Sequence, residues 1–197
     1  MVPNFDKSRE GLTWQKLFQL FLLFRPRNNY AISKLEGFDE LDSIFLESKN
    51  IKGIIVDFDG TLAPRRQMIT FNNHQRLHRL KKEGFNICIF SNMTFSDRYE
   101  DLDFPIITSP YAKPDTRGFL DACKILKLPP KKVIMVGDNF MTDGGAIRAG
   151  LSFVYIKPLI ANESFSMNLL RLPEKITRWF FSWLSSFYDS ILHREVF

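Results

Sequence analysis

The sequence predicts an α/β protein with a parallel sheet of about five strands and helices on both faces. Through the middle of the chain, short runs of β-branched and aromatic residues alternate with segments of helical periodicity. This alternation is the pattern of βαβ units. The runs are also followed by polar residues, and ligands of such sheets bind beyond the carboxyl ends of the strands. Fold class and the place of a binding site are therefore predicted together.

Five runs are predicted to be strands. The first, residues 53–58, is the β-branched run Gly-Ile-Ile-Val-Asp-Phe, which ends at a polar turn. The others are residues 85–91, 105–108, 133–136 and 153–156. Helices are predicted for residues 71–82, 117–128 and 142–149, with Gly150 as a suitable residue to end the last one. Connections of this length join parallel strands by crossovers.

Amphipathic helices are predicted at both ends of the chain. They divide it into an N-terminal helical segment (1–34), a catalytic domain (35–160) and a C-terminal helical tail (161–197). At the front, apolar residues recur at helical spacing: Trp14, Leu17, Phe18, Phe21 and Leu22. In the tail, the apolar positions are Ile176, Trp179, Phe180, Trp183, Leu184, Phe187, Tyr188, Ile191 and Leu192.

Three interpretations of the terminal helices stay open at this stage. They pack on the domain, contact a partner protein, or lie in a membrane interface with Trp and Phe at headgroup depth. The tail's polar face consists of Thr177, Arg178, Ser182, Ser185, Ser186, Asp189 and Ser190. Because this face is poor in Lys and Arg, it speaks against the membrane interpretation.

The composition is that of a globular chain with a mild basic excess. The 197 residues carry a net charge of +5, and the excess lies in residues 51–156. Such a surface favours anionic partners or simply keeps a protein in solution. Cys88 and Cys123 lie in apolar runs, so buried free thiols in a reducing, intracellular compartment are expected, either cytoplasm or an organellar matrix. The longest apolar stretch, residues 17–24, is shorter than the roughly 20 residues of a bilayer span, and no secretory signal opens the sequence.

Charged and hydroxyl residues follow four of the predicted strands, and these ends share one edge of the sheet. They are Asp57-Phe58-Asp59-Gly60-Thr61, Ser91-Asn92, Lys113-Pro114 after a short loop, and Gly137-Asp138 with Asp143 five residues later. Clustered carboxylates repel one another, and a divalent cation relieves that repulsion. Oxygen ligands in this number suit Mg²⁺. The predicted metal ligands are Asp57, Asp59, Asp138 and Asp143; the place of Asp143, one turn into the following helix, favours a role in holding Lys113 or a metal-bound water.

This set of residues predicts phosphoryl transfer. A carboxylate such as Asp57 can attack phosphorus and form an aspartyl-phosphate. Asp59, two residues along, is placed to protonate the leaving oxygen and then to activate water. Lys113 supplies a fixed positive charge beside the metal. The candidate phosphate-binding residues are Thr61, Ser91, Asn92 and Lys113.

The four ordered motifs resemble those of the haloacid dehalogenase (HAD) superfamily. The resemblance is carried by Asp57-Phe58-Asp59-Gly60-Thr61, Ser91-Asn92, Lys113-Pro114 and residues 137–143, Gly-Asp-Asn-Phe-Met-Thr-Asp. It implies a Rossmannoid fold, Mg²⁺ as the cofactor, Asp57 as nucleophile and Asp59 as acid and base. An aspartate as the second acid points to phosphoryl transfer and away from dehalogenation.

The spacing of the motifs leaves no room for a cap domain. Residues 62–90 and 92–112 each hold one helix and one strand and little else. An open site suits a large or surface-bound substrate, since small metabolites are usually enclosed by a lid. Residues 35–180 resemble the uncapped subfamily IIIA, the YqeG-type and phosphatidylglycerophosphate-phosphatase-like proteins. This likeness implies phosphatidylglycerophosphate as a candidate substrate.

Three functions remain after this reading. The first is a phosphatase for a lipid phosphate, with peripheral membrane contact through the terminal helices; Arg65 and Arg66 then are candidate headgroup contacts, or else solvated charges. The second is the same chemistry on a soluble, nucleic-acid or protein phosphate, although aromatic and basic residues do not interleave near the motifs as in single-strand binders. The third is a non-catalytic interaction protein, which the intact set of catalytic residues disfavours. Oligomeric state is not readable from the sequence.

Overall fold

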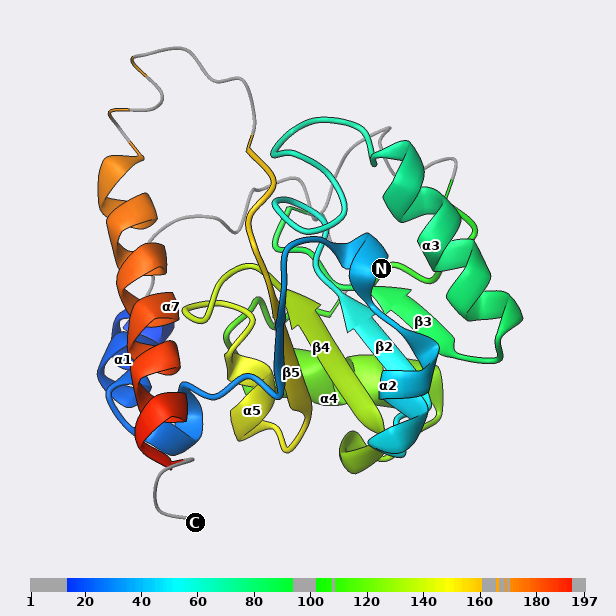
Figure 1. The fold of residues 1–197 in the computed structure, drawn as a ribbon, viewed down its shortest axis with the longest axis horizontal. Helices are drawn as coiled ribbons and strands as arrows, with labels where there is room; N and C mark the ends of the chain where they lie inside the picture. The colour runs from blue at the N-terminus through cyan, green and yellow to red at the C-terminus, as the bar shows by residue number, and fades with distance from the viewer. Residues whose placement is uncertain are drawn as a thin grey trace.

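The computed structural model describes residues 14–93, 102–107, 109–160, 166, 169 and 171–192. Its centre is a five-stranded sheet in the order β1-β5-β4-β2-β3 (Figure 1). Every neighbouring pair in this sheet is parallel. The strands are β1 (Ser33–Leu35), β2 (Gly53–Val56), β3 (Asn86–Ile89), β4 (Val133–Gly137) and β5 (Ser152–Ile156). The predicted α/β fold is confirmed.

Helices cover both faces of the sheet because the side chains of each strand alternate between two hydrophobic clusters. Ile54 and Val56 of β2 lie in one cluster, whereas Ile55 lies in the other. The first cluster includes residues of α2 (Ser43–Ser48) and α3 (Phe71–Lys82), and the second includes residues of α4 (Thr116–Leu126) and α5 (Gly145–Arg148). Short 3-10 helices occupy Pro26–Asn28, Phe38–Glu40 and Pro130–Lys132.

Two predicted elements differ from the structure. The run 105–108 was expected to be a strand, but Ile106 forms only an isolated parallel bridge with Ile89. Pro105 has no N–H to donate to a ladder, which limits the pairing there. The helix expected over 142–149 is shortened to α5, because residues 141–144 form turns and the paired glycines at 144 and 145 are poor helix formers. Thr108 lies outside the described residues.

The fifth strand of the sheet comes from a segment that the sequence pattern did not reveal. β1 pairs with β5 through Ser33, Lys34 and Leu35, and all three residues are only half-buried. Three residues without an apolar run give no strand signal. The division of the chain at residues 34 and 160 stays a prediction, and β1 spans the first of these boundaries.

The terminal helices α1 (Trp14–Leu23) and α7 (Leu172–Leu192) lie side by side at one side of the molecule (Figure 1). Rings of Phe24 and Phe181 meet edge to face with centroids 5.5 Å apart. The Tyr188 hydroxyl donates to the Phe24 carbonyl at 2.8 Å, and the Asn29 side chain donates to the Phe181 carbonyl at 3.1 Å. The two amphipathic helices are thus joined to each other and to the second hydrophobic cluster.

The buried side of α7 is not the apolar stripe that the sequence indicated. Phe181, Leu184 and Ser185 are buried, and only the edge of the stripe reaches the domain. Much of the stripe is exposed: Ile176, Trp179, Trp183, Phe187 and Ile191. None of the helices in the described part of the chain has the length and apolar character needed to cross a bilayer.

The packing of α7 predicts unequal effects for two aromatic truncations. Phe181→Ala should lower the free energy of unfolding by about 3 kcal/mol, because Phe181 is 4% exposed and its loss leaves a cavity. Trp183→Ala should lower it by less than about 1 kcal/mol, since Trp183 is 50% exposed. Urea unfolding followed by circular dichroism measures both. Equal, small effects would mean that α7 is not held on the domain in solution.

Candidate active site

Asp57 occupies the first position after β2, an interior strand of the sheet. Its backbone N–H donates to the Val136 carbonyl at 2.9 Å, which continues the pairing with β4 one residue beyond the ladder. The side chain is buried at the carboxyl edge of the sheet, and Asp57 is 7% exposed. The sheet itself therefore fixes the predicted nucleophile.

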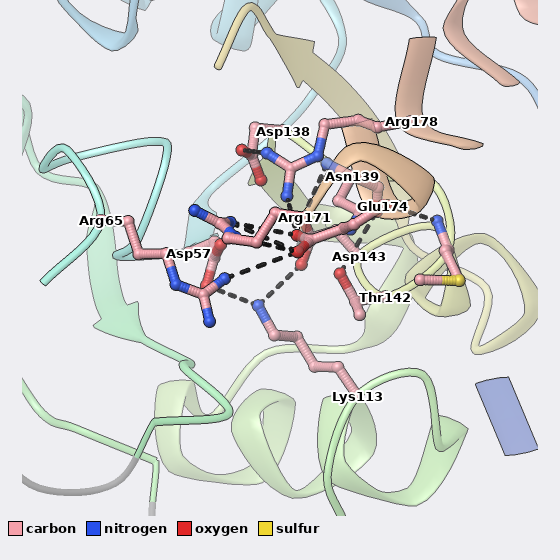
Figure 2. A network of polar contacts seen from close by, with 11 residues as sticks. Asp57, Arg65, Lys113, Asp138, Asn139, Thr142, Asp143, Arg171, Glu174 and Arg178 are labelled. Carbon is pink, nitrogen blue, oxygen red and sulfur yellow. Dashed lines mark hydrogen bonds and ion pairs between the residues drawn. The ribbon is translucent and has the colours of Figure 1, made fainter. Parts of the chain in front are cut away.

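Lys113 joins two of the carboxylates (Figure 2). Its Nζ donates to Asp57 Oδ1 at 2.6 Å and to Asp143 Oδ1 at 2.7 Å. Asn92 holds the lysine from the other end, because its Oδ1 accepts from the Lys113 N–H and its Nδ2 donates to the Lys113 carbonyl. Burial alone would lower the pKa of Lys113, but Asp143 and Asp57 outweigh it and raise this pKa above its ordinary value. The ammonium therefore stays charged.

Asp57, Asp138 and Asp143 form a buried acidic group whose ligand atoms lie within 4.8 Å of one another. Burial raises the pKa of Asp57 well above its ordinary value; Lys113 opposes the shift, and Asp143 and Asp138 add to it. Burial likewise raises the pKa of Asp138 from 3.8 to about 6, against the attraction of Arg178. Three crowded carboxylates, among which Asp57 and Asp138 resist ionisation, fit a divalent cation, which would supply the missing positive charge.

Gly60 and Gly137 make room for these carboxylates. Gly60 has a φ of +92°, and a Cβ at this position would overlap the carboxylate of Asp138. A Cβ at Gly137 would overlap the carboxylate of Asp143. Side chains larger than hydrogen would displace the acidic group, so the glycines belong to the architecture of the site.

The remaining predicted residues lie at different distances from this centre. Ser91 and Asn92 line the cavity at the site, and the Ser91 hydroxyl accepts from the Met93 N–H at 3.1 Å. Thr61 is fully buried, does not line the cavity, and its Oγ1 has no hydrogen-bond partner among the described residues. Asp59 lines the cavity, but its carboxylate accepts from the Arg66 N–H at 2.7 Å and is outside the acidic group found among the described residues. The roles of Asp59 and Thr61 stay predictions.

Comparison with known proteins supports the predicted family. The sequence model of the haloacid dehalogenase-like hydrolases matches residues 66–150, which include Ser91, Lys113, Asp138 and Asp143. A relative from Bacillus subtilis, named "Probable phosphatase YqeG", is 28% identical over 138 residues, which are 66% of this chain and 78% of the relative. The chain is thus similar to the haloacid dehalogenase-like hydrolases, as its motifs predicted, and the relative's name supports the predicted phosphatase.

Solved structures of other proteins resemble this protein in part. An uncharacterized protein from Listeria monocytogenes serotype 4b aligns with a TM-score of 0.46 and 20% identity over 64% of this chain and 97% of that one. The cobalt-bound deoxy-D-mannose-octulosonate 8-phosphate phosphatase YrbI from Haemophilus influenzae aligns with a TM-score of 0.48 and 16% identity, over 61% of this chain and 75% of that one. The family assignment depends on the sequence matches and not on these likenesses.

The terminal helices reach into the site, which the sequence did not suggest. A cavity of about 320 Å³ lies over the acidic group, and its wall includes Lys16 of α1 together with Glu174 and Arg178 of α7. Arg178 Nη1 forms a very short ion pair with Asp138 Oδ2, and its Nη2 donates to Glu174 Oε1 at 2.8 Å. The one available signal was the i, i+4 pairing of Glu174 with Arg178 on the polar face of the tail.

Arg65 and Arg66, which follow the nucleophile loop, have different surroundings. Arg65 lines the cavity and lies 3.8 Å from Glu174, measured from Nη1 to Oε2. Arg66 is exposed, and its backbone has a φ of +57°. Of the two predicted headgroup contacts, the structure brings Arg65 to the site.

The raised pKa of Asp138 predicts how a metal and pH affect stability. Between pH 3.8 and about 6, the folded protein keeps a proton on Asp138 that the unfolded chain has lost. In EDTA the contribution of Asp138 to the free energy of unfolding should therefore fall as pH rises through this window. A divalent cation should offset that fall, because it binds the ionised carboxylates of the folded state only.

Urea unfolding from about pH 4 to about pH 7, with EDTA or with a divalent cation, measures this effect. Asp138→Asn should flatten the pH dependence and abolish the effect of the cation. The exposed Asp103, which pairs with Lys81 at 2.7 Å, gives the control variant Asp103→Asn. Equal behaviour of both variants and the wild type would contradict the proposed metal site.

Proposed function

We propose that this HAD hydrolase is a Mg²⁺-dependent phosphatase that acts through an aspartyl-phosphate on Asp57. The single observation that carries the proposal is the placement of a buried carboxylate at a strand end, 2.6 Å from a buried lysine and beside two further aspartates. A nucleophilic carboxylate needs this neutralising environment to approach an anionic phosphate. The similarity to a protein named as a probable phosphatase supports the same class.

The chain's own residues account for both chemical steps. An oxygen of Asp57 attacks phosphorus and the bond from phosphorus to the leaving oxygen breaks, while Asp59 gives that oxygen a proton. Water then attacks the phosphorus of the aspartyl-phosphate and gives a proton to Asp59, while the bond from phosphorus to the Asp57 oxygen breaks and frees the Asp57 carboxylate. The net products are an alcohol and inorganic phosphate. Lys113, with Ser91 at the cavity wall, is placed to bind phosphoryl oxygens during both steps.

Asp57 and Asp138 are the residues we expect to hold Mg²⁺, because both line the cavity and belong to the acidic group. Asp143 is fully engaged with Lys113 and with the Asn139 N–H, so we assign it to holding the lysine. When bound, Mg²⁺ neutralises charge on the phosphoryl oxygens. Arg178 has to release or share Asp138 when the cation arrives, since both contact the same carboxylate.

Asp57→Asn should abolish turnover of phosphomonoesters, by at least about 10³-fold, because an amide cannot act as the nucleophile. Phosphate release measured with Mg²⁺, and unfolding measured in parallel, separate lost chemistry from lost fold. Asp103→Asn, at an exposed surface ion pair, is the matched control and should retain full activity. Mg²⁺-dependent turnover by a folded Asp57→Asn protein would contradict the mechanism.

We further propose a lipid phosphate, such as phosphatidylglycerophosphate, as the substrate. Exposed aromatic and aliphatic side chains lie on α1, on the residue that follows it, and on α7: Trp14, Phe18, Phe21, Phe24, Ile176, Trp179, Trp183 and Phe187. Trp and Phe at such positions suit the headgroup region of a bilayer. Trp179 is 66% exposed and also lines a cavity that adjoins the active site. This continuity supports a substrate that enters from an apolar surface.

The lipid proposal predicts a strong preference for substrate in mixed micelles. Phosphatidylglycerophosphate should be hydrolysed with a kcat/KM at least about tenfold above that of glycerol 3-phosphate, with EDTA as the blank. The double variant Trp179→Ala/Trp183→Ala should lose this advantage, because it removes aromatic contact with the interface while Phe181 still anchors α7. A preference for the soluble ester, or an unchanged preference in the double variant, would reject the lipid assignment.

A further inference from the structure

A second cavity, of about 430 Å³, adjoins the catalytic one. Asp59, Arg65, Glu174 and Arg178 line both cavities, so the two share a wall. Five basic side chains line the second cavity: Arg65, Lys157, Arg171, Lys175 and Arg178. Asp59 and Glu174 are the acidic residues that line it. The cavity therefore has a clear excess of positive charge.

The carboxylate of Glu174 lies at the focus of three guanidinium groups (Figure 2). Arg178 Nη2 is 2.8 Å from Oε1, Arg171 Nε is 3.3 Å from Oε2, and Arg65 Nη1 is 3.8 Å from Oε2. Burial alone would raise the pKa of Glu174, but Arg178 and Arg171 outweigh burial and lower it. Several arginines that converge on one carboxylate form the arrangement that binds phosphate oxygens.

Arg178 also has a hydrogen-bond donor, its Nε–H, that is not used within the described part of the chain. The nitrogen is buried. A buried donor without an acceptor is costly, which a bound anion would correct. The charge excess, the focused arginines and the unused donor all point to an anion larger than a carboxylate.

We propose that this second cavity is an anion subsite that binds a phosphate or phosphodiester group on the leaving-group side of the substrate and displaces the Glu174 carboxylate from the arginines. The inference rests on the proposed phosphatase function, because the shared wall would place the second anion beside the reacting phosphomonoester. Leu159, Ile160 and Trp179 also line this cavity, so its wall offers apolar contacts to the rest of the leaving group.

A purely structural role for the cluster would be to clamp α7 to the domain. That role is already filled elsewhere along the helix. Phe181 and Leu184 are buried, the Phe181 carbonyl accepts from Asn29, and Asp189 pairs with Lys34 at 2.8 Å. Because α7 is anchored along its later turns, Glu174 is left able to exchange its arginine partners for a ligand.

The test compares alkanediol bisphosphates of three to six carbons with the corresponding monophosphates, with Mg²⁺. For at least one chain length, the bisphosphate should have a higher kcat/KM than the corresponding monophosphate, after correction for its two equivalent esters. Arg171→Ala should reduce the ratio of bisphosphate to monophosphate kcat/KM by about tenfold, the effect of losing one charge-assisted contact. Glu174→Gln should raise the ratio about threefold, because it removes the competing carboxylate.

The control is Lys131→Ala, which removes an exposed charge at the opposite end of the sheet and should leave the ratio unchanged. A clamp predicts the opposite pattern for Glu174→Gln, namely lower stability and equal losses on both substrates. A ratio that stays the same in Arg171→Ala and Glu174→Gln would overturn the subsite. Stimulation of monophosphate turnover by free inorganic sulfate would show that the cavity takes a free anion, and would overturn a tethered second group.

Binding of an alkane bisphosphonate, measured by titration calorimetry, separates this inference from the proposed function. The wild type should bind it more tightly than Arg171→Ala and less tightly than Glu174→Gln. If no ester is hydrolysed but this order holds, the phosphatase proposal fails and the anion subsite stands. If esters are hydrolysed but the three proteins bind the bisphosphonate equally, the phosphatase stands and the subsite is wrong.

Discussion

The buried contacts of Lys113 with Asp57 and Asp143 are the interaction on which the active site depends. The ammonium ties together three separate segments: the end of β2, the loop before α4 and the turn after β4. Removal of one partner from such a cluster leaves an uncompensated buried charge. The Asn92 side chain donates to the Lys113 carbonyl and accepts from the Lys113 N–H, and so holds the backbone from which the ammonium extends. The proposed catalysis and the local fold therefore depend on the same groups, the Lys113 ammonium and the aspartate carboxylates. The glycines at 60 and 137 provide the space that the carboxylates need.

Most of the sheet and its carboxyl edge could be predicted because both depend on local patterns. β2 and β4 are continuous apolar runs followed by an aspartate, and parallel pairing brings such ends together whatever the rest of the chain does. The same reasoning did not predict β1, because a three-residue edge strand is too short to show a periodic pattern. It wrongly predicted a strand over residues 105–108, where Pro105 limits the pairing to an isolated bridge at Ile106. Pattern analysis succeeds where burial on both faces forces a continuous apolar sequence.

The contribution of α7 could not be predicted, because an amphipathic pattern defines two faces and this helix uses three. Phe181 and Leu184 face the second hydrophobic cluster, Trp179 and Trp183 face outward, and Arg178 faces the acidic group. The direction in which a helix turns its polar face depends on tertiary contacts between segments far apart in the sequence, such as Asn29 with Phe181. The polar face of a helix, which a sequence pattern suggests is exposed to solvent, can also contact a buried charge, as Arg178 contacts Asp138.

This third face gives the uncapped fold a partial substitute for a cap. The motif spacing leaves no inserted domain between the strands, yet Arg178 lies against Asp138 and Glu174 forms part of the cavity wall. The pairing of Arg178 with Asp138 gives this carboxylate a positive partner, which matters because burial otherwise disfavours its charge. The same helix exposes aromatic side chains two turns or less away from Arg178, so one element contributes both to the outer apolar surface and to the surroundings of the acidic group.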